Sequence, residues 1–305
     1  MTPNHPIRKF WGNPVIVKDV RIRMRGYRAF ILITVHLVVL LLAVGIAYLV
    51  FRSALTSTGN LEERRLFGKS VFGLLVWIEL VMVSFVAPAV TSGSISSERE
   101  RQTFDILRVT LLPAYQLVLG KYLPGLFFVF LLLFTSIPLQ GPAFLIGGVL
   151  WQEILLAVLI LAVTAVAFCA LGLLLSSLVR RTLIATTLAY ASTIFLVFGI
   201  PIICLILLVL FSSAISNRFD QLSGQTEGFL LIIGWVLVSL TPLGVMVGTE
   251  AILLDQQSLL LASIPLSDGK TVVLLSPWIP YVLFYLGFSI AALWLSILLV
   301  RQLDN

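Results

Sequence analysis

Long apolar stretches separated by short polar segments make up most of this chain. Six stretches hold about 20 or more mainly apolar residues, the length that an α-helix needs to cross a membrane core about 30 Å thick. They lie near residues 29–51, 71–93, 118–140, 153–178, 184–211 and 278–300. None shows the alternation of apolar and polar residues typical of barrel strands, and helices satisfy their own backbone hydrogen bonds in lipid. The pattern predicts an all-α integral membrane protein with six core transmembrane helices.

A seventh apolar run, 229–247, leaves the number of spans open. It is long enough to cross a membrane, but Thr241-Pro242 interrupts it and Glu250 follows it. Proline removes a backbone donor from a helix, and irregular backbone is tolerated at membrane depth where protein buries it. We expect a re-entrant or non-spanning segment between the fifth and sixth spans, inside an extracytoplasmic region at 212–277.

Composition and charge agree with a membrane protein that has both termini in the cytoplasm. Hydrophobic residues make up 59% of the chain and charged residues 11%, too apolar for a single aqueous core. With six spans and the N-terminus inside, fourteen Lys and Arg lie on the inner side and six on the outer side, as the positive-inside rule requires. A seventh span leaves these counts unchanged. The net charge of +6 is thereby explained without nucleic-acid binding, and the basic N-terminus before a span-length run predicts an uncleaved anchor in the plasma membrane.

The first 28 residues predict an amphipathic helix. Asn13-Pro14 is typical of a helix start. Basic residues recur on one side of this helix, and Trp11 is a candidate anchor at the membrane interface. The basic residues are Lys18, Arg21, Arg25 and Arg28, and the opposite arc holds Ile16, Val17, Val20, Met24 and Tyr27. Such a helix lies among lipid headgroups; the alternative is that its cations only enforce topology.

Residues 94–108, within a cytoplasmic segment at 94–116, form the most polar part of the chain. Ser96 or Ser97 can cap a helix, and acidic residues then fall near its positive dipole end. Its charged residues include Glu98, Arg99, Glu100 and Arg101, and Thr103 follows. Phe104 and Leu107 line one face, and Pro113 ends the helix. This arrangement suits docking into a groove of another protein, or else it is a solvated loop helix without a partner.

The order of residues around this segment forms a recognisable pattern. It runs through residues 95–107, 110–113 and 119–121, the last being Leu-Gly-Lys. The pattern resembles the signature of the type 2 permease family of ATP-binding-cassette (ABC) exporters, approximately E-x-E-x-G-T, L-x-x-x-P and then Gly-Lys opening the third span. It departs at Gln102, where the family usually has Gly, and at Leu112, where Thr is usual before the proline. Residues 13–26 are similar to the family's amphipathic elbow, so the resemblance covers the whole chain.

The resemblance implies a coupling helix at 94–108 that sits in a cleft of a separate ATPase subunit. By position, Glu98, Glu100 and Arg101 would make polar contacts to that subunit, and Phe104 and Leu107 would anchor it. It also implies a single transmembrane domain over 1–305 that works as a homo- or heterodimer. ATP and magnesium would be bound by the partner and not by this chain. The transported substrate and the choice between the two kinds of dimer cannot be read from the sequence.

Catalytic and metal-binding patterns are missing from the sequence, so we expect no enzyme and no cofactor. Gly68-Lys69-Ser70 is like the end of a phosphate loop, but position 63, where such a loop has Gly, is Glu63. His36 is the one His within a predicted span, and we expect it to form a hydrogen bond between helices. Cys169 and Cys204 lie in apolar spans, as small core residues do.

Glu79 is the one acid deep within a predicted span. A charge at a helix centre costs roughly 2.5 to 3.5 kcal/mol on insertion scales, so this side chain should face protein or water. Substrate contact, helix packing and a proton relay are all open roles. An ion-coupled secondary transporter that uses Glu79, or a non-transporting scaffold subunit, are therefore the alternatives to the exporter.

Overall fold

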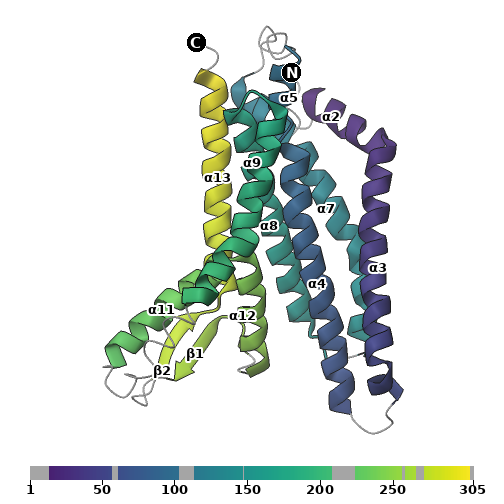
Figure 1. The fold of residues 1–305 in the computed structure, drawn as a ribbon, viewed down its shortest axis with the longest axis vertical. Coiled ribbons are helices and arrows are strands. Elements are labelled where there is room, and N and C mark those ends of the chain that lie inside the picture. The colour runs from purple at the N-terminus through teal and green to yellow at the C-terminus, as the bar shows by residue number, and fades with distance from the viewer. Residues whose placement is uncertain are drawn as a thin grey trace, which may run out of the picture. The chain divides into compact units, whose positions relative to one another are not determined.

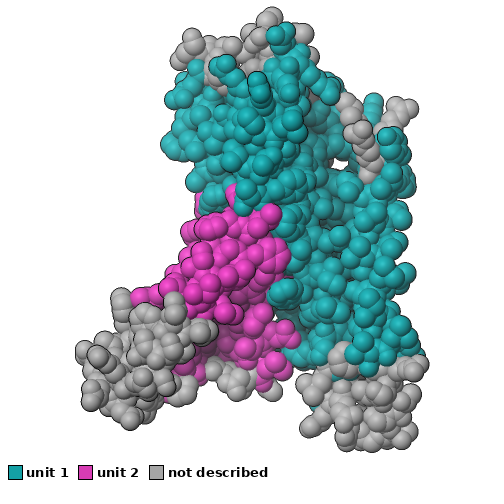
Figure 2. Space-filling view, in the orientation of Figure 1, with its two compact units in different colours: residues 1–191, 288–305 teal, residues 192–287 magenta. Residues whose placement is uncertain are grey.

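The computed structural model describes residues 14–56, 61–102, 113–146, 148–207, 224–255, 258–265 and 271–302. The chain divides into two compact units, which Figure 2 shows in different colours. One consists of residues 1–191 and 288–305, and the other of residues 192–287. The single domain expected over 1–305 stays a prediction.

Six helices are long and apolar enough to cross a membrane, as predicted. They are α3 (Tyr27–Thr56), α4 (Leu61–Thr91), α7 (Ala114–Ile146), α8 (Trp151–Leu178), α9 (Thr182–Ile194) with its continuation to Leu207, and α13 (Trp278–Gln302). The prediction of a helical, multi-pass membrane protein is therefore confirmed.

In the first unit, α4 packs against α3, α7 and α8 (Figure 1). Apolar side chains of α4 and α8, among them Leu80 and Phe168, are almost completely buried. The backbones of α4 and α8 approach closely at Gly172, where a Cβ would lie 2.8 Å from the carbonyl oxygen of Pro88 and would also meet Thr91. Small residues let membrane helices approach in this way. The close approach brings the end of α4 next to the end of α8.

Two shorter helices of this unit, α2 (Pro14–Arg25) and α5 (Ser96–Glu100), lie near Thr91, the last residue of α4. α2 lies against α7, and α5 follows α4 after a short turn (Figure 1). The predicted N-terminal helix is therefore present. Its place in the membrane surface stays a prediction.

The second unit begins within the fifth span. A wider π-helical turn, η1 (Phe195–Gly199), precedes Pro201 in that helix. Proline has no N–H to donate and its ring clashes with the preceding turn, so a local change of helix type accommodates it.

The apolar run at 229–247 is split between two helices of the second unit. α11 (Gly224–Leu240) and α12 (Pro242–Asp255) meet at Thr241 with a bend of 119°, so that they form a broken span or a re-entrant loop. Thr241 Oγ1 accepts a hydrogen bond from the N–H of Gly244, which caps α12. Thr241-Pro242 thus interrupts the helix as expected, while the re-entrant path through the membrane stays a prediction.

Two strands also belong to the second unit and depart from the all-α prediction. β1 (Leu261–Pro265) and β2 (Thr271–Leu275) pair in antiparallel register, with Leu261 opposite Leu275. Trp235 donates a hydrogen bond from Nε1 to the carbonyl oxygen of Leu275. This bond ties the hairpin to α11.

Candidate functional site

The turn from α4 into α5 is fixed by its own serines. Ser94 Oγ donates to the carbonyl oxygen of Thr91 at 2.6 Å, and Ser96 Oγ donates to that of Ser92 at 3.2 Å. Ile95 between them is fully buried. Local side-chain bonds of this kind offer the backbone an alternative to continuing the helix. α4 therefore ends before the charged segment begins.

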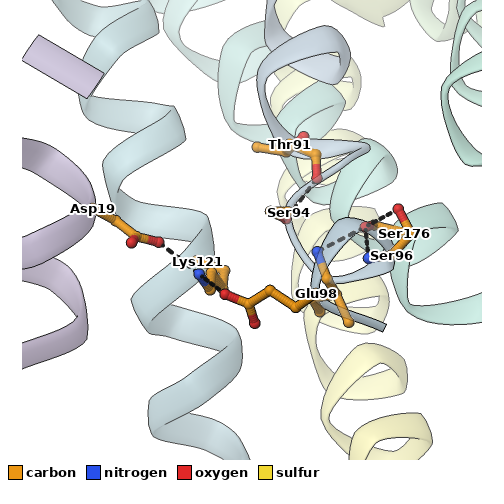
Figure 3. A network of polar contacts seen from close by, with 8 residues as sticks. Asp19, Thr91, Ser94, Ser96, Glu98, Lys121 and Ser176 are labelled. Carbon is orange, nitrogen blue, oxygen red and sulfur yellow. Dashed lines mark hydrogen bonds and ion pairs between the residues drawn. The ribbon is translucent and has the colours of Figure 1, made fainter. Parts of the chain in front are cut away.

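Ser176 of α8 caps the start of α5 from another helix. Its Oγ accepts hydrogen bonds from the N–H groups of Ile95 and Ser96, both at 3.0 Å (Figure 3). The predicted cap by Ser96 or Ser97 is wrong, since Ile95 occupies the cap position and makes no side-chain cap bond. The hydroxyl of Ser96 is instead directed back to the preceding turn.

Lys121 of α7 lies between two carboxylates from different helices. Its Nζ is 2.8 Å from Asp19 Oδ2 on α2 and 2.5 Å from Glu98 Oε1 on α5 (Figure 3). Only 7% of Lys121 is exposed, and such a buried cation is tolerated when ionic partners surround it. We call Asp19, Glu98, Lys121 and Ser176 together the α5 junction. It connects α5 with α2, α7 and α8.

The neighbours of Glu98 strengthen the same attachment. Arg99 donates from Nη1 to the carbonyl oxygen of Ser177 at 2.8 Å. Glu100 accepts hydrogen bonds from the N–H of Thr182 at 3.2 Å and from its hydroxyl at 2.6 Å, at the start of α9. Arg101 is exposed. Three of the residues that the sequence suggested for docking therefore hold α5 in place, and Arg101 is presented outward.

The predicted helix over 94–108 is not continuous in its described part. α5 covers five residues, Ser96–Glu100, and Gln102 has a φ of 58°. This left-handed conformation does not continue a right-handed helix and is adopted most easily by glycine. Thr103, Phe104 and Leu107, for which we predicted contact with a partner, lie outside the described residues.

The basic side of α2 is arranged only partly as predicted. Lys18 and Arg21 are exposed. Arg25 and Arg28 lie in α2 and α3, and their side chains are outside the described part of the structure, as is Trp11 altogether. The apolar residues Val17, Met24 and Tyr27 are also exposed, as expected for a helix that meets lipid on that side.

Two residues that α2 turns toward the bundle, Asp19 and Arg23, are not among the predicted site residues. Asp19 pairs with Lys121, and Arg23 is partly buried near Gly125 of α7. Burial lowers the pKa of the Arg23 guanidinium, and the nearby Asp19 carboxylate opposes this effect. The sequence does contain a signal for the Asp19 contact, because Asp19 is the one acid among the first 28 residues and lies in an otherwise basic helix.

Glu79 lies inside the bundle, as the cost of a charge in lipid led us to expect. It is 1% exposed and contacts two residues of α7. Ser136 Oγ is hydrogen-bonded to Glu79 Oε1, and Gln140 Nε2 donates to Glu79 Oε2 at 2.8 Å. His36 of α3 contacts Met82 of α4 through Nδ1 and Sδ at 3.3 Å, which confirms the predicted contact between helices.

The tripeptide Gly68-Lys69-Ser70, which is like the end of a phosphate loop, is part of the helix α4. Lys69 Nζ forms an ion pair with Glu153 Oε1 of α8 at 2.8 Å. Among the residues that the structure describes, no group of three or more His, Cys, Asp or Glu could hold a metal ion. No protein-family model and no curated protein sequence matches this chain.

Proposed function

We propose that this chain is the membrane-spanning permease subunit of an ATP-driven ABC exporter. It forms the translocation pathway as a homo- or heterodimer in the plasma membrane and couples to a separate ATPase subunit, which binds ATP and magnesium. The positive-inside distribution supports a cytoplasmic location for α5 and both termini. Residues 95–107 supply the signature on which this assignment first rests.

The α5 junction is the observation that carries the proposal. A short helix outside the apolar spans is joined to α2 and α7 through Lys121 and to α8 through Ser176. A displacement of α5 is thereby passed to several helices at once. A partner that closes on ATP and pulls on α5 can then shift the membrane helices between inward and outward access.

The backbone at Gln102 supports the family assignment. The signature usually has Gly at this position, and Gln102 adopts the left-handed φ of 58° that glycine favours. Gln102 thus departs from the family pattern in residue type but adopts a backbone conformation that suits glycine. By the resemblance, Phe104 and Leu107 would be the apolar anchor for the ATPase.

A second candidate is a secondary transporter driven by an ion gradient. The burial of Glu79 inside the bundle favours it. The structure gives Glu79 two neutral partners, Ser136 and Gln140, which is few groups for a proton pathway across a membrane. In a non-transporting scaffold subunit, a coupling helix held by the α5 junction would be redundant.

The test compares Arg101, which is exposed, and Phe104, which follows it in the sequence, with an exposed residue elsewhere on the proposed cytoplasmic side. The tagged chain is purified from its native membranes after mild crosslinking, and co-purified ATPase activity is measured with the protein that carries it identified by mass spectrometry. Arg101→Glu combined with Phe104→Ala should abolish co-purification, whereas Arg301→Glu should retain it, since Arg301 is exposed at the far end of α13. Transport driven by a pH gradient in liposomes that hold this chain alone would overturn the exporter and favour the second candidate.

A further inference from the structure

Glu79 is buried within the apolar part of α4. It lies twelve residues after Phe67, where the apolar part of α4 begins, or about 18 Å along the helix axis. Its side chain is buried against α7. An isolated carboxylate in such surroundings is so costly that the group usually becomes neutral instead.

The hydrogen bonds of Ser136 indicate that Oε1 of Glu79 carries a proton. Its Oγ is within hydrogen-bond distance of two acceptors, Glu79 Oε1 and the carbonyl oxygen of Leu133 at 2.7 Å. A serine hydroxyl has a single hydrogen and can donate fully to one of them. If Glu79 is ionised, both oxygens compete for this hydrogen. If Glu79 carries a proton on Oε1, it donates to Ser136, and Ser136 donates to Leu133.

Gln140 completes the surroundings without supplying a positive charge. Its Nε2 donates to Glu79 Oε2, which a protonated acid still offers as an acceptor, while its buried Oε1 has no hydrogen-bond partner. On α3, the titratable group nearest to this place is His36, which contacts Met82 one turn along α4 and whose buried Nε2 also has no partner.

The other titratable groups on the helices that pack against α4 lie further away. Lys121 and Tyr122 of α7 are at least fourteen residues before Ser136, about 21 Å along the helix. On α8, Glu153 is engaged with Lys69, ten residues before Glu79, and Cys169 contacts Ala87, eight residues after it. These separations correspond to about 15 Å and 12 Å along α4. Within the described structure, Glu79 therefore has neutral groups beside it.

We propose that Glu79 is a proton-binding site, held as a neutral carboxylic acid that hydrogen-bonds α4 to α7. The proton sits on Oε1 and is shared with Ser136, and Oε2 accepts from Gln140. Release of the proton would turn the Ser136 hydroxyl from Leu133, within α7, to Glu79 and leave an anion without a counter-charge between two spans. The free energy of the α4–α7 contact therefore depends on the proton. This site is independent of the proposed exporter function and would exist in a transporter of either kind.

Infrared spectroscopy of the purified full-length protein in lipid nanodiscs tests the site directly. At neutral pH the wild-type spectrum should contain the C=O stretch of a protonated carboxylic acid, and labelling of Glu with carbon-13 should shift it. Glu79→Gln should remove this band. Glu153→Gln should leave it unchanged, since Glu153 is paired with Lys69. Ser136→Ala should move its frequency, because the hydrogen-bond acceptor of the acid is lost.

The wild-type spectrum alone can overturn the proposal. If it has no protonated Glu band at neutral pH, Glu79 is ionised, whatever the variants do. If the band is present but stays unchanged in Ser136→Ala and in folded Glu79→Gln, the proton belongs to another residue. Should Glu79→Gln fail to fold, the isotope shift in the wild type and the frequency change in Ser136→Ala decide the outcome together.

Discussion

The α5 junction and the Glu79 cluster (Glu79, Ser136 and Gln140) both attach α7 to other helices, but they do so with opposite chemistry. At the α5 junction, Lys121 is paired with Asp19 and Glu98. In the Glu79 cluster, one acid is surrounded by a hydroxyl and an amide. Ion pairs connect α2, α5 and α7 at the end of the bundle. Neutral hydrogen bonds connect α4 and α7, where two apolar spans pack side by side.

This difference bears on how each contact can change. An ion triad is broken at high cost when one partner is lost, because the remaining charges stay buried. A hydrogen-bonded neutral acid can be replaced by a group of the same shape at little cost. We therefore expect the α5 junction to behave as a fixed connection and the Glu79 cluster to respond to its proton.

Removal of the central cation should give the largest effect. Lys121→Met leaves the partly buried carboxylates of Asp19 and Glu98 near each other without a counter-charge. We expect the free energy of unfolding to fall by about 3 to 5 kcal/mol, the range found when one partner of a buried ion pair is removed. Denaturant titration of the purified protein in mixed micelles, followed by tryptophan fluorescence, measures this loss.

The matched control restores neutrality at the same place. Lys121→Met combined with Asp19→Asn and Glu98→Gln should recover most of the lost stability, since no unpaired charge remains. A triple variant as unstable as the single one would show that Lys121 acts through its packing rather than through its charge.

The next effect comes from the close approach of α4 and α8, on which the position of Ser176 depends. Gly172→Ala places a Cβ against the backbone of Pro88 and against Thr91. Overpacking of this kind costs about 1 to 3 kcal/mol. Gly45→Ala is the control, because a Cβ at Gly45 of α3 meets nothing within 4 Å, and it should be neutral or slightly stabilising. Equal unfolding curves for the two variants would contradict the close approach.

Loss of the cap on α5 should have a smaller effect. Ser176→Ala removes the acceptor for the N–H groups of Ile95 and Ser96, and cap removal costs about 1 kcal/mol. The expected readout is faster hydrogen–deuterium exchange of the peptide that contains α5. Ser177→Ala is the control, since the Ser177 hydroxyl bonds within its own helix to Leu174. If the amide hydrogens of α5 exchange equally fast in both variants, Ser176 is not the cap of α5.

The spans of this fold could be predicted from the sequence, whereas its junctions could not. Apolar length alone identifies a membrane helix, because lipid demands about 20 apolar residues wherever the helix packs. The α5 junction depends on partners that are distant in sequence, since Asp19 and Lys121 are 102 positions apart. Periodicity within one helix carries no information on such a pair.

Two local predictions near α5 were wrong. The cap of α5 was assigned to Ser96 or Ser97 because capping is usually local, but a serine from α8 supplies it. The charged segment was expected to be one helix up to Pro113 because its cap and acidic first turn predict a helix start, but Gln102 adopts a left-handed conformation. At the cap, a tertiary contact overrides the local preference of the sequence.

The smallest effect, and the sharpest distinction between the two regions, comes from the same substitution made in each. Glu79→Gln reproduces a protonated acid, since its amide donates to Ser136 and its carbonyl accepts from Gln140. We expect it to change the free energy of unfolding by less than about 1 kcal/mol. Glu98→Gln removes a charge from the ion pair with Lys121 and should cost about 1.5 to 3 kcal/mol, as for hydrogen bonds to charged groups. Unfolding titrations at neutral pH compare the two, and a Glu79→Gln loss as large as that of Glu98→Gln would mean that Glu79 is an anion.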